Sequence, residues 1–274
     1  MNEDVYENVN ENRNGFASRA CHTVRMRIVA DTHVHSYPFY DLPRQLGAAV
    51  RNLSHAAPDA TVRLLCLTER AGQYVFEALA SGDVKAPGWT ISPAGDGSAL
   101  TAMRAEHECL TVLPGRQFVT AERIEVLALG RDLRIEDGLP LDVTLARVRE
   151  QEVTPVLPWG LGKWWGARGR LVRNVLDTSA PGDVVFADTC LRPALFPTPA
   201  LLRKARSRGF LILYGSDPLP RPGEEELTGL WASQWEADWD PAHPAATWRR
   251  LMRDPAAKPV GRRCSMGEAF SRLW

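Results

Sequence analysis

The sequence lacks several features that would place it quickly in a class of proteins. Its 274 residues hold no apolar run near the roughly 20 residues of a membrane helix, so no membrane partner is expected. The five cysteines form no Cys-x-x-Cys pair, which argues against disulfides or a thiolate zinc site. The 33 Lys and Arg balance 33 Asp and Glu, without the basic excess of nucleic-acid binders. These absences predict a cytoplasmic protein that does not bind nucleic acid.

The composition predicts one sizeable core. Hydrophobic residues make up 45% of the chain and charged residues 24%, as in globular proteins. Residues 1–25 are polar and lack an apolar core segment, so we expect a disordered N-terminal tail there. The fold begins at Met26, which leaves open whether Met1 or Met26 is the natural start. We therefore expect a single domain over residues 26–274.

Short β-rich runs alternate with amphipathic segments along this domain. The apolar periodicity predicts helices over 42–55, 142–151, 170–178 and 198–209. Trp231, Trp235 and Trp239 recur every four residues, which favours one face of a further helix. Strand and helix alternation implies a parallel sheet, open or closed. The expected strands cover seven segments, namely 27–35, 61–68, 109–120, 124–129, 153–157, 183–188 and 210–214.

The segment Ala-Asp-Thr-His-Val-His at the end of the first predicted strand carries the clearest chemistry. Alternate strand residues share a face, so Asp31, His33 and His35 are expected to project together. Two imidazoles with this spacing can chelate one divalent ion, and a neighbouring carboxylate can orient them. The alternative is an ordinary pair of histidines at a strand end.

The order of several short motifs over residues 26–222 resembles the polymerase and histidinol phosphatase (PHP) superfamily. Asp-x-His-x-His is followed by Thr-Glu-Arg, then Pro-Gly-x-Gln before Glu-Val-Leu-Ala-Leu-Gly, and finally Gly-Ser-Asp. The resemblance implies an α/β fold, a distorted (β/α)7 TIM-like barrel with divalent metals at its C-terminal face. It also implies phosphoesterase activity.

The resemblance assigns ligands residue by residue. His33 and His35 match the first ligands of the family, and Asp217 matches its late aspartate. Glu69 replaces an aspartate and is expected to complete the coordination or act as general base, whereas Arg70 replaces a histidine. We expect one ion, Zn, Mn or Fe, because further family ligands are replaced by Gln117, Leu157 and Leu219.

A glycine-rich loop with basic residues follows the fifth predicted strand. Lys163, Arg168 and Arg170 lie in a segment without acidic residues, where backbone N–H groups and cations favour an anion. We therefore expect these three residues, with Arg70 and Gln117, to bind the substrate. Asp188, at the end of the sixth predicted strand, is the second candidate catalytic residue.

These observations predict a metal-dependent hydrolase, a phosphoesterase acting on a small anionic substrate. The replaced ligands leave an alternative open, a catalytically degenerate PHP-like barrel that binds an anionic ligand or a protein partner. A hydrolase of the amidohydrolase type ranks lowest, because the later strand ends lack its further histidines and lysine. The sequence does not indicate the oligomeric state.

Overall fold

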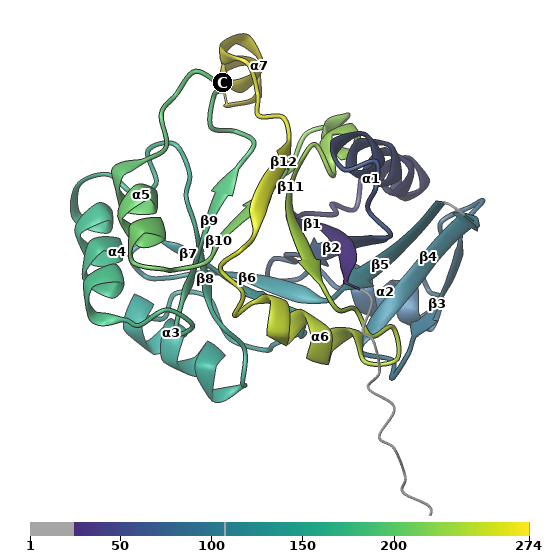
Figure 1. Ribbon diagram of the computed structural model, residues 1–274, viewed down its shortest axis with the longest axis horizontal. Helices are drawn as coiled ribbons and strands as arrows, with labels where there is room; N and C mark the ends of the chain where they lie inside the picture. The colour runs from purple at the N-terminus through teal and green to yellow at the C-terminus, as the bar shows by residue number, and fades with distance from the viewer. Residues whose placement is uncertain (1–24, 107, 274) are drawn as a thin grey trace, which may run out of the picture.

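The structure is a computed structural model that describes residues 25–106 and 108–273 (Figure 1). The predicted N-terminal tail, apart from Arg25, lies outside the described residues, and so does any test of the natural start. Within the described ranges, no helix has the length and apolar character needed to cross a membrane.

The strands of the described chain form two separate sheets. The first sheet has seven strands in the order β12-β11-β1-β2-β5-β4-β3, and the second has five in the order β10-β9-β8-β7-β6. The strands are β1 (Met26–Val34), β2 (Val62–Leu67), β3 (Thr90–Ala94), β4 (Ala99–Ala105), β5 (Glu108–Leu113), β6 (Gly115–Val119), β7 (Glu125–Leu129), β8 (Val156–Pro158), β9 (Val185–Thr189), β10 (Ile212–Gly215), β11 (Trp231–Ala237) and β12 (Lys258–Gly261).

Helices cover the outer faces of both sheets (Figure 1). The four predicted helices are present as α1, α3, α4 and α5. In α1, the Asp41 side chain accepts a hydrogen bond from Arg44 N at 3.0 Å and caps the first turn. The helices are α1 (Leu42–Ala56), α2 (Val75–Ser81), α3 (Leu141–Glu150), α4 (Gly166–Thr178), α5 (Ala200–Ser207), α6 (Pro244–Leu251) and α7 (Met266–Leu273), with a 3-10 turn η1 (Glu224–Leu227).

Three apolar clusters hold these layers together. One packs α1 against the outer face of the seven-stranded sheet. Another packs α3, α4 and α5 against the outer face of the five-stranded sheet. The third lies between the two sheets and includes Ile28 and Leu64 from one sheet and Val185 and Leu213 from the other. The inner faces of the sheets therefore share one buried interior.

The predicted closed (β/α)7 TIM-like barrel is wrong, because the described residues form two open mixed sheets. A closed barrel would need its last parallel strand to pair with β1. That edge of β1 is instead paired, antiparallel, with β11. At the other end, Pro114 has no N–H to continue the ladder of β5. A single bridge joins Glu69, which lies just after β2, to Arg116 of β6. The predicted strand 109–120 is consequently divided into β5 and β6.

The helix predicted from the tryptophan spacing is also wrong. Trp231 and Trp235 lie on strand β11, where residues four apart share a face just as they do on a helix. Trp235 is buried between the sheets and its ring meets that of Trp248 edge to face, with centroids 6.1 Å apart. The aromatic spacing therefore marks one face of a strand.

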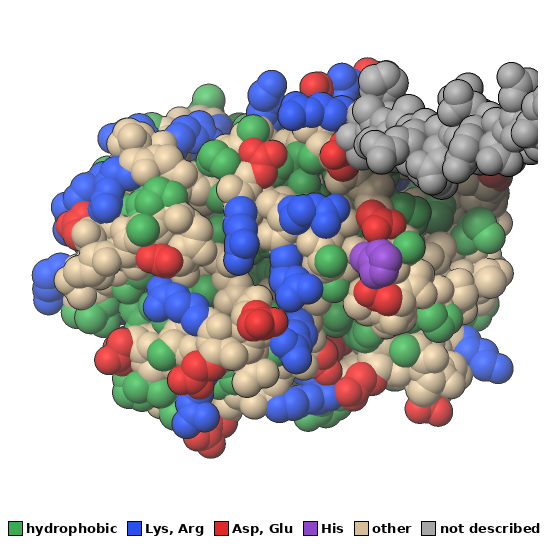
Figure 2. All heavy atoms as spheres, turned by 60° about the horizontal axis from the view of Figure 1, so that its bottom comes forward, with side chains coloured by type: hydrophobic (Ala, Val, Ile, Leu, Met, Phe, Trp, Pro, Cys, Tyr) green, Lys and Arg blue, Asp and Glu red, His purple; other side chains and the backbone are tan. Residues whose placement is uncertain are grey.

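Charges of both signs lie beside one another on the surface that Figure 2 shows. Basic side chains run across the middle of this face, and acidic side chains border them. Charges of both signs are therefore interspersed on this face.

Candidate metal centre

The candidate centre lies where β1 and β10 approach each other. His33 lies on β1, His35 follows this strand, and Asp217 follows β10. All three side chains are buried. The close approach depends on Gly215, because a Cβ at this position would lie 2.5 Å from Cβ of His33.

The three side chains converge on one point. Nε2 of His33 lies 3.2 Å from Nε2 of His35, and Oδ1 of Asp217 lies 3.5 and 3.6 Å from these two nitrogens. Ligands bound tetrahedrally at roughly 2.0–2.1 Å stand about 3.4 Å apart, so this geometry matches that of ligands sharing an ion. The group can hold one metal ion.

The surroundings keep one imidazole in the form that binds metals. Burial, followed by the neighbouring His33, lowers the pKa of His35 to about 3, so this ring is neutral at pH 7. Its Nδ1 lies 3.5 Å from the Thr68 hydroxyl, which can fix the ring orientation. Oε1 of Gln117 lies 3.3 Å from Nε2 of His33 and adds a neutral oxygen to the centre.

Asp217 is held in an unusual backbone conformation. Its φ of 50° lies in the left-handed region that non-glycine residues rarely adopt. Its N–H donates to the His33 carbonyl at 2.9 Å, and Nη2 of Arg272 donates to its carbonyl at 3.3 Å. Burial raises the pKa of the Asp217 carboxyl, but electrostatic interactions with His33, Lys163 and other neighbours outweigh this effect and hold the pKa below its ordinary value. The carboxylate is therefore available as a ligand.

Asp31 connects the backbone segments around the centre through hydrogen bonds. Its carboxylate accepts hydrogen bonds from the N–H groups of Ser216 and Gly229, at 2.9 and 2.7 Å, and from the Ser216 hydroxyl. It also accepts from His33 N at 3.2 Å. Burial raises the pKa of Asp31 to about 6 although these hydrogen bonds lower it. Asp31 thus fixes β1 to two loops and is not one of the convergent groups.

Cationic side chains surround the group. Nζ of Lys163 lies 2.6 Å from both carboxylate oxygens of Glu125. Burial lowers the pKa of Lys163, but Glu125 and Asp217 outweigh it and raise this pKa above its ordinary value. Arg70 is exposed and hydrogen bonds to the Tyr37 hydroxyl. Its charge also lowers the pKa of His35, although less than burial and the charge of His33 do. Lys163 and Arg70 thus place positive charge beside the centre.

The buried Glu69 faces away from solvent. Its Oε1 accepts from Phe76 N at 2.8 Å, and its Oε2 lies 3.7 Å from Nη1 of Arg116. Burial raises the pKa of Glu69 to about 7, although these contacts lower it. Its carbonyl accepts from Gln117 N at 2.9 Å, so its backbone is tied to the strand that carries Gln117.

Three other predicted site residues are not part of the convergent group. Arg168 donates to the Gly162 carbonyl at 3.0 Å, and Arg170 is exposed on α4. Asp188 is bound by Arg192, with Nη2 of Arg192 2.6 Å from its Oδ2. Asp188 lies two residues after Phe186, on the helix-covered face of β9, whereas Ala187 faces the space between the sheets.

Sequence reasoning missed two contributors to the centre. The ring of Tyr37, two residues beyond His35, lies beside that of His35, with centroids 5.6 Å apart. Arg272 on α7 contacts the Asp217 carbonyl, although the two residues are 55 positions apart in the sequence. No local pattern in the sequence indicates that contact.

Comparison of the chain with known protein families and with curated proteins finds no match. Among solved structures, it resembles PsfC from Pseudomonas syringae PB-5123, with 17% sequence identity and a TM-score of 0.51. The match covers 90% of this chain and 95% of the PsfC chain. At this identity, the likeness shows a shared fold.

Proposed function

We propose that this protein is a metal-dependent hydrolase that cleaves a phosphoester in a small anionic substrate. The observation that carries this proposal is the buried convergence of His33, His35 and Asp217, whose ligand atoms lie within 4.8 Å of one another. The motif order that resembles the PHP superfamily supports the phosphoester as the bond cleaved. One divalent ion, Zn, Mn or Fe, fits these nitrogen and oxygen donors.

Residues of the chain would bind the substrate and transfer the proton. When bound, the ion would supply Lewis-acid polarisation and lower the pKa of a water molecule. Lys163 and Arg70 provide the positive charge that binds and orients an anionic group beside the centre. Glu69, with a pKa near 7, is assigned the role of general base, because proton transfer is efficient when the pKa lies near the working pH. Gln117 orients the substrate through its amide.

Metal content and turnover test the proposal together. We expect protein purified without chelator or metal-affinity resin to carry about one equivalent of metal and to hydrolyse p-nitrophenyl phosphate. The variant His33→Ala with His35→Ala should lose both the metal and the turnover. The matched control His55→Ala with His243→Ala removes two exposed histidines and should keep both. Full turnover in the first variant would contradict the proposal.

A second candidate function is binding without catalysis, of an anionic ligand or a protein partner. The specific observation in its favour is that residues unable to replace the family's histidine ligands, such as Arg70, Leu157 and Leu219, stand at their positions. This function predicts that the wild-type protein binds metal or anion but shows no turnover on any phosphomonoester. Turnover that depends on the two histidines would exclude it.

A further inference from the structure

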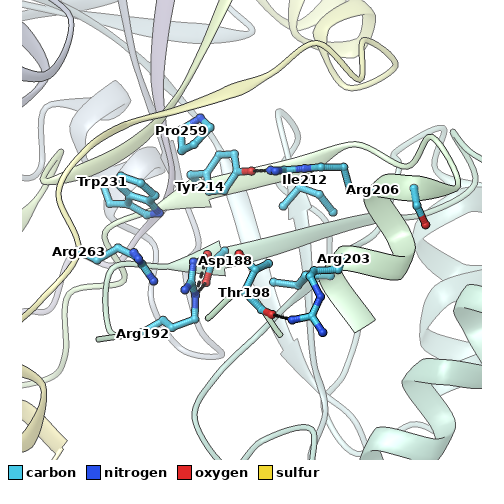
Figure 3. A pocket seen from close by; sticks show the side chains of 12 residues that line it. Asp188, Arg192, Thr198, Arg203, Arg206, Ile212, Tyr214, Trp231, Pro259 and Arg263 are labelled. Carbon is cyan, nitrogen blue, oxygen red and sulfur yellow. Dashed lines mark hydrogen bonds and ion pairs between the residues drawn. The ribbon is translucent and has the colours of Figure 1, made fainter. Parts of the chain in front are cut away.

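A cavity of about 550 Å³ lies on the opposite face of the five-stranded sheet from the candidate metal centre. It is bounded by α5, by the ends of β9 and β10, by Trp231 of β11 and by the segment around Arg263 (Figure 3). Tyr214 and Asp188 line it from the helix-covered face, whereas their neighbour Gly215 faces His33. The two sites are therefore separated by the sheet itself.

Arginine dominates the charge of this cavity. Arg263 and Arg192 lie at one end and Arg203 and Arg206 at the other (Figure 3). The only carboxylate among the lining residues is Asp188, and Arg192 already binds it through Nε and Nη2, with N–O distances of 2.6–3.0 Å. The cavity thus has an excess of positive charge.

The remaining arginines contact neutral acceptors. Arg203 donates to the Thr198 carbonyl and Arg206 to the Tyr214 hydroxyl. Arg263 donates to backbone carbonyls, among them that of Ala194 at 2.6 Å. Within the described part of the chain, no ion pair joins these three arginines to a carboxylate. Burial and then the charge of Arg192 lower the pKa of Arg263, although Asp188 raises it in part.

The wall between the two basic ends is aromatic and apolar. Trp231 and Tyr214 meet edge to face with centroids 5.6 Å apart, and Leu202 and Ile212 add aliphatic surface. Nε1 of Trp231 is buried and has no hydrogen-bond partner, although buried indole N–H groups usually have one.

We propose that this cavity binds an aromatic organic phosphate, a dianion with a flat apolar group. Guanidinium forks match the oxygens of phosphate in two-point hydrogen bonds, which favours this anion over a monovalent one. The aromatic wall accommodates the flat part of the ligand, and the volume lies in the range of pockets that hold small organic molecules, roughly 300–1,000 Å³.

Isothermal titration calorimetry with 1-naphthyl phosphate tests the proposal on the full chain. EDTA is present throughout, so that a metal ion does not contribute to binding. We expect 1-naphthyl phosphate to bind at least about tenfold more tightly than inorganic phosphate or 1-naphthol, because charge-assisted hydrogen bonds and apolar contact each contribute. If 1-naphthyl phosphate does not bind, or binds no more tightly than inorganic phosphate, the proposal is overturned.

Variants locate the site. Arg203→Gln with Arg206→Gln should weaken binding by about tenfold or more, and both residues are exposed on α5, so the variant is expected to fold. Arg147→Gln, an exposed substitution on α3, is the matched control and should bind like the wild type. The variant His33→Ala with His35→Ala should also keep its affinity. Loss of binding in that variant, or unchanged binding in the double arginine variant, would overturn the proposal and leave the proposed hydrolase activity untouched.

Discussion

Replacing Gly215 by alanine should separate the two parts of the candidate metal centre. A Cβ at position 215 would lie 2.5 Å from Cβ, 2.6 Å from N and 3.1 Å from Cα of His33. Carbon atoms in contact prefer about 3.5–4.0 Å, so β10 and β1 must move apart by about 1 Å. The atoms met belong to the backbone and Cβ of a buried strand, which cannot rotate away.

The expected cost appears in both stability and metal binding. Overpacking of this kind destabilises a core by about 1–3 kcal/mol. Ligand distances in metal sites tolerate about 0.2 Å, so a shift of about 1 Å between Asp217 and the two histidines should lower metal affinity by at least tenfold. Urea denaturation measures the first effect, and competition with a metallochromic chelator measures the second.

Gly267→Ala is the matched control for this substitution. Gly267 lies on α7, and a Cβ there would meet no atom within 4 Å. Because alanine favours a helix over glycine by roughly 1 kcal/mol, this variant should be as stable as the wild type or more so, with unchanged metal affinity. If Gly215→Ala binds metal as tightly as this control, the inferred approach of β1 and β10 is wrong.

Three further substitutions test the surroundings of the centre. Burial raises the pKa of Glu69 from 4.5 to about 7. Between pH 4.5 and 7, the native state therefore keeps a proton that the unfolded state has released. The free energy of unfolding should then fall by up to about 3 kcal/mol as the pH rises across this range. Glu69→Gln should flatten this dependence in melting curves at pH 5 and 8; an unchanged slope would refute it. Lys163→Met should raise KM for an anionic substrate about tenfold without changing metal content, and equal KM values would contradict its role. Arg272→Met leaves the buried Glu224 without its ion-pair partner and should lower the free energy of unfolding by about 3–5 kcal/mol in urea denaturation. An unchanged free energy of unfolding would show that this ion pair does not form.

Local patterns in the sequence predict part of the fold and two members of the centre. The apolar periodicity identifies the four helices that cover the sheets. The alternation of His33 and His35 identifies a shared face, because His33 lies on β1 and His35 is only one residue beyond its end. Asp217 was found only through the order of motifs, since no local pattern indicates which loop meets the end of β1.

The remaining features depend on contacts between distant segments. A spacing of four residues places side chains on one face of both a helix and a strand, so Trp231 and Trp235 could not distinguish them. The misassigned segment forms the strand that pairs antiparallel with β1, whereas the closed barrel was expected from the family resemblance. The arginine cavity draws Arg192, Arg206 and Arg263 from separate segments, and only the folded chain brings them together.

The convergent ligands come from two different sheets. His33 and His35 belong to the end of β1 in the seven-stranded sheet, and Asp217 follows β10 in the five-stranded sheet. An ion held by all three would act as a cross-link between the sheets, so its binding free energy would also resist their separation. Amide exchange along β1 and β10 should then slow when metal is added, and the sheet interface should be the part of the protein that responds most.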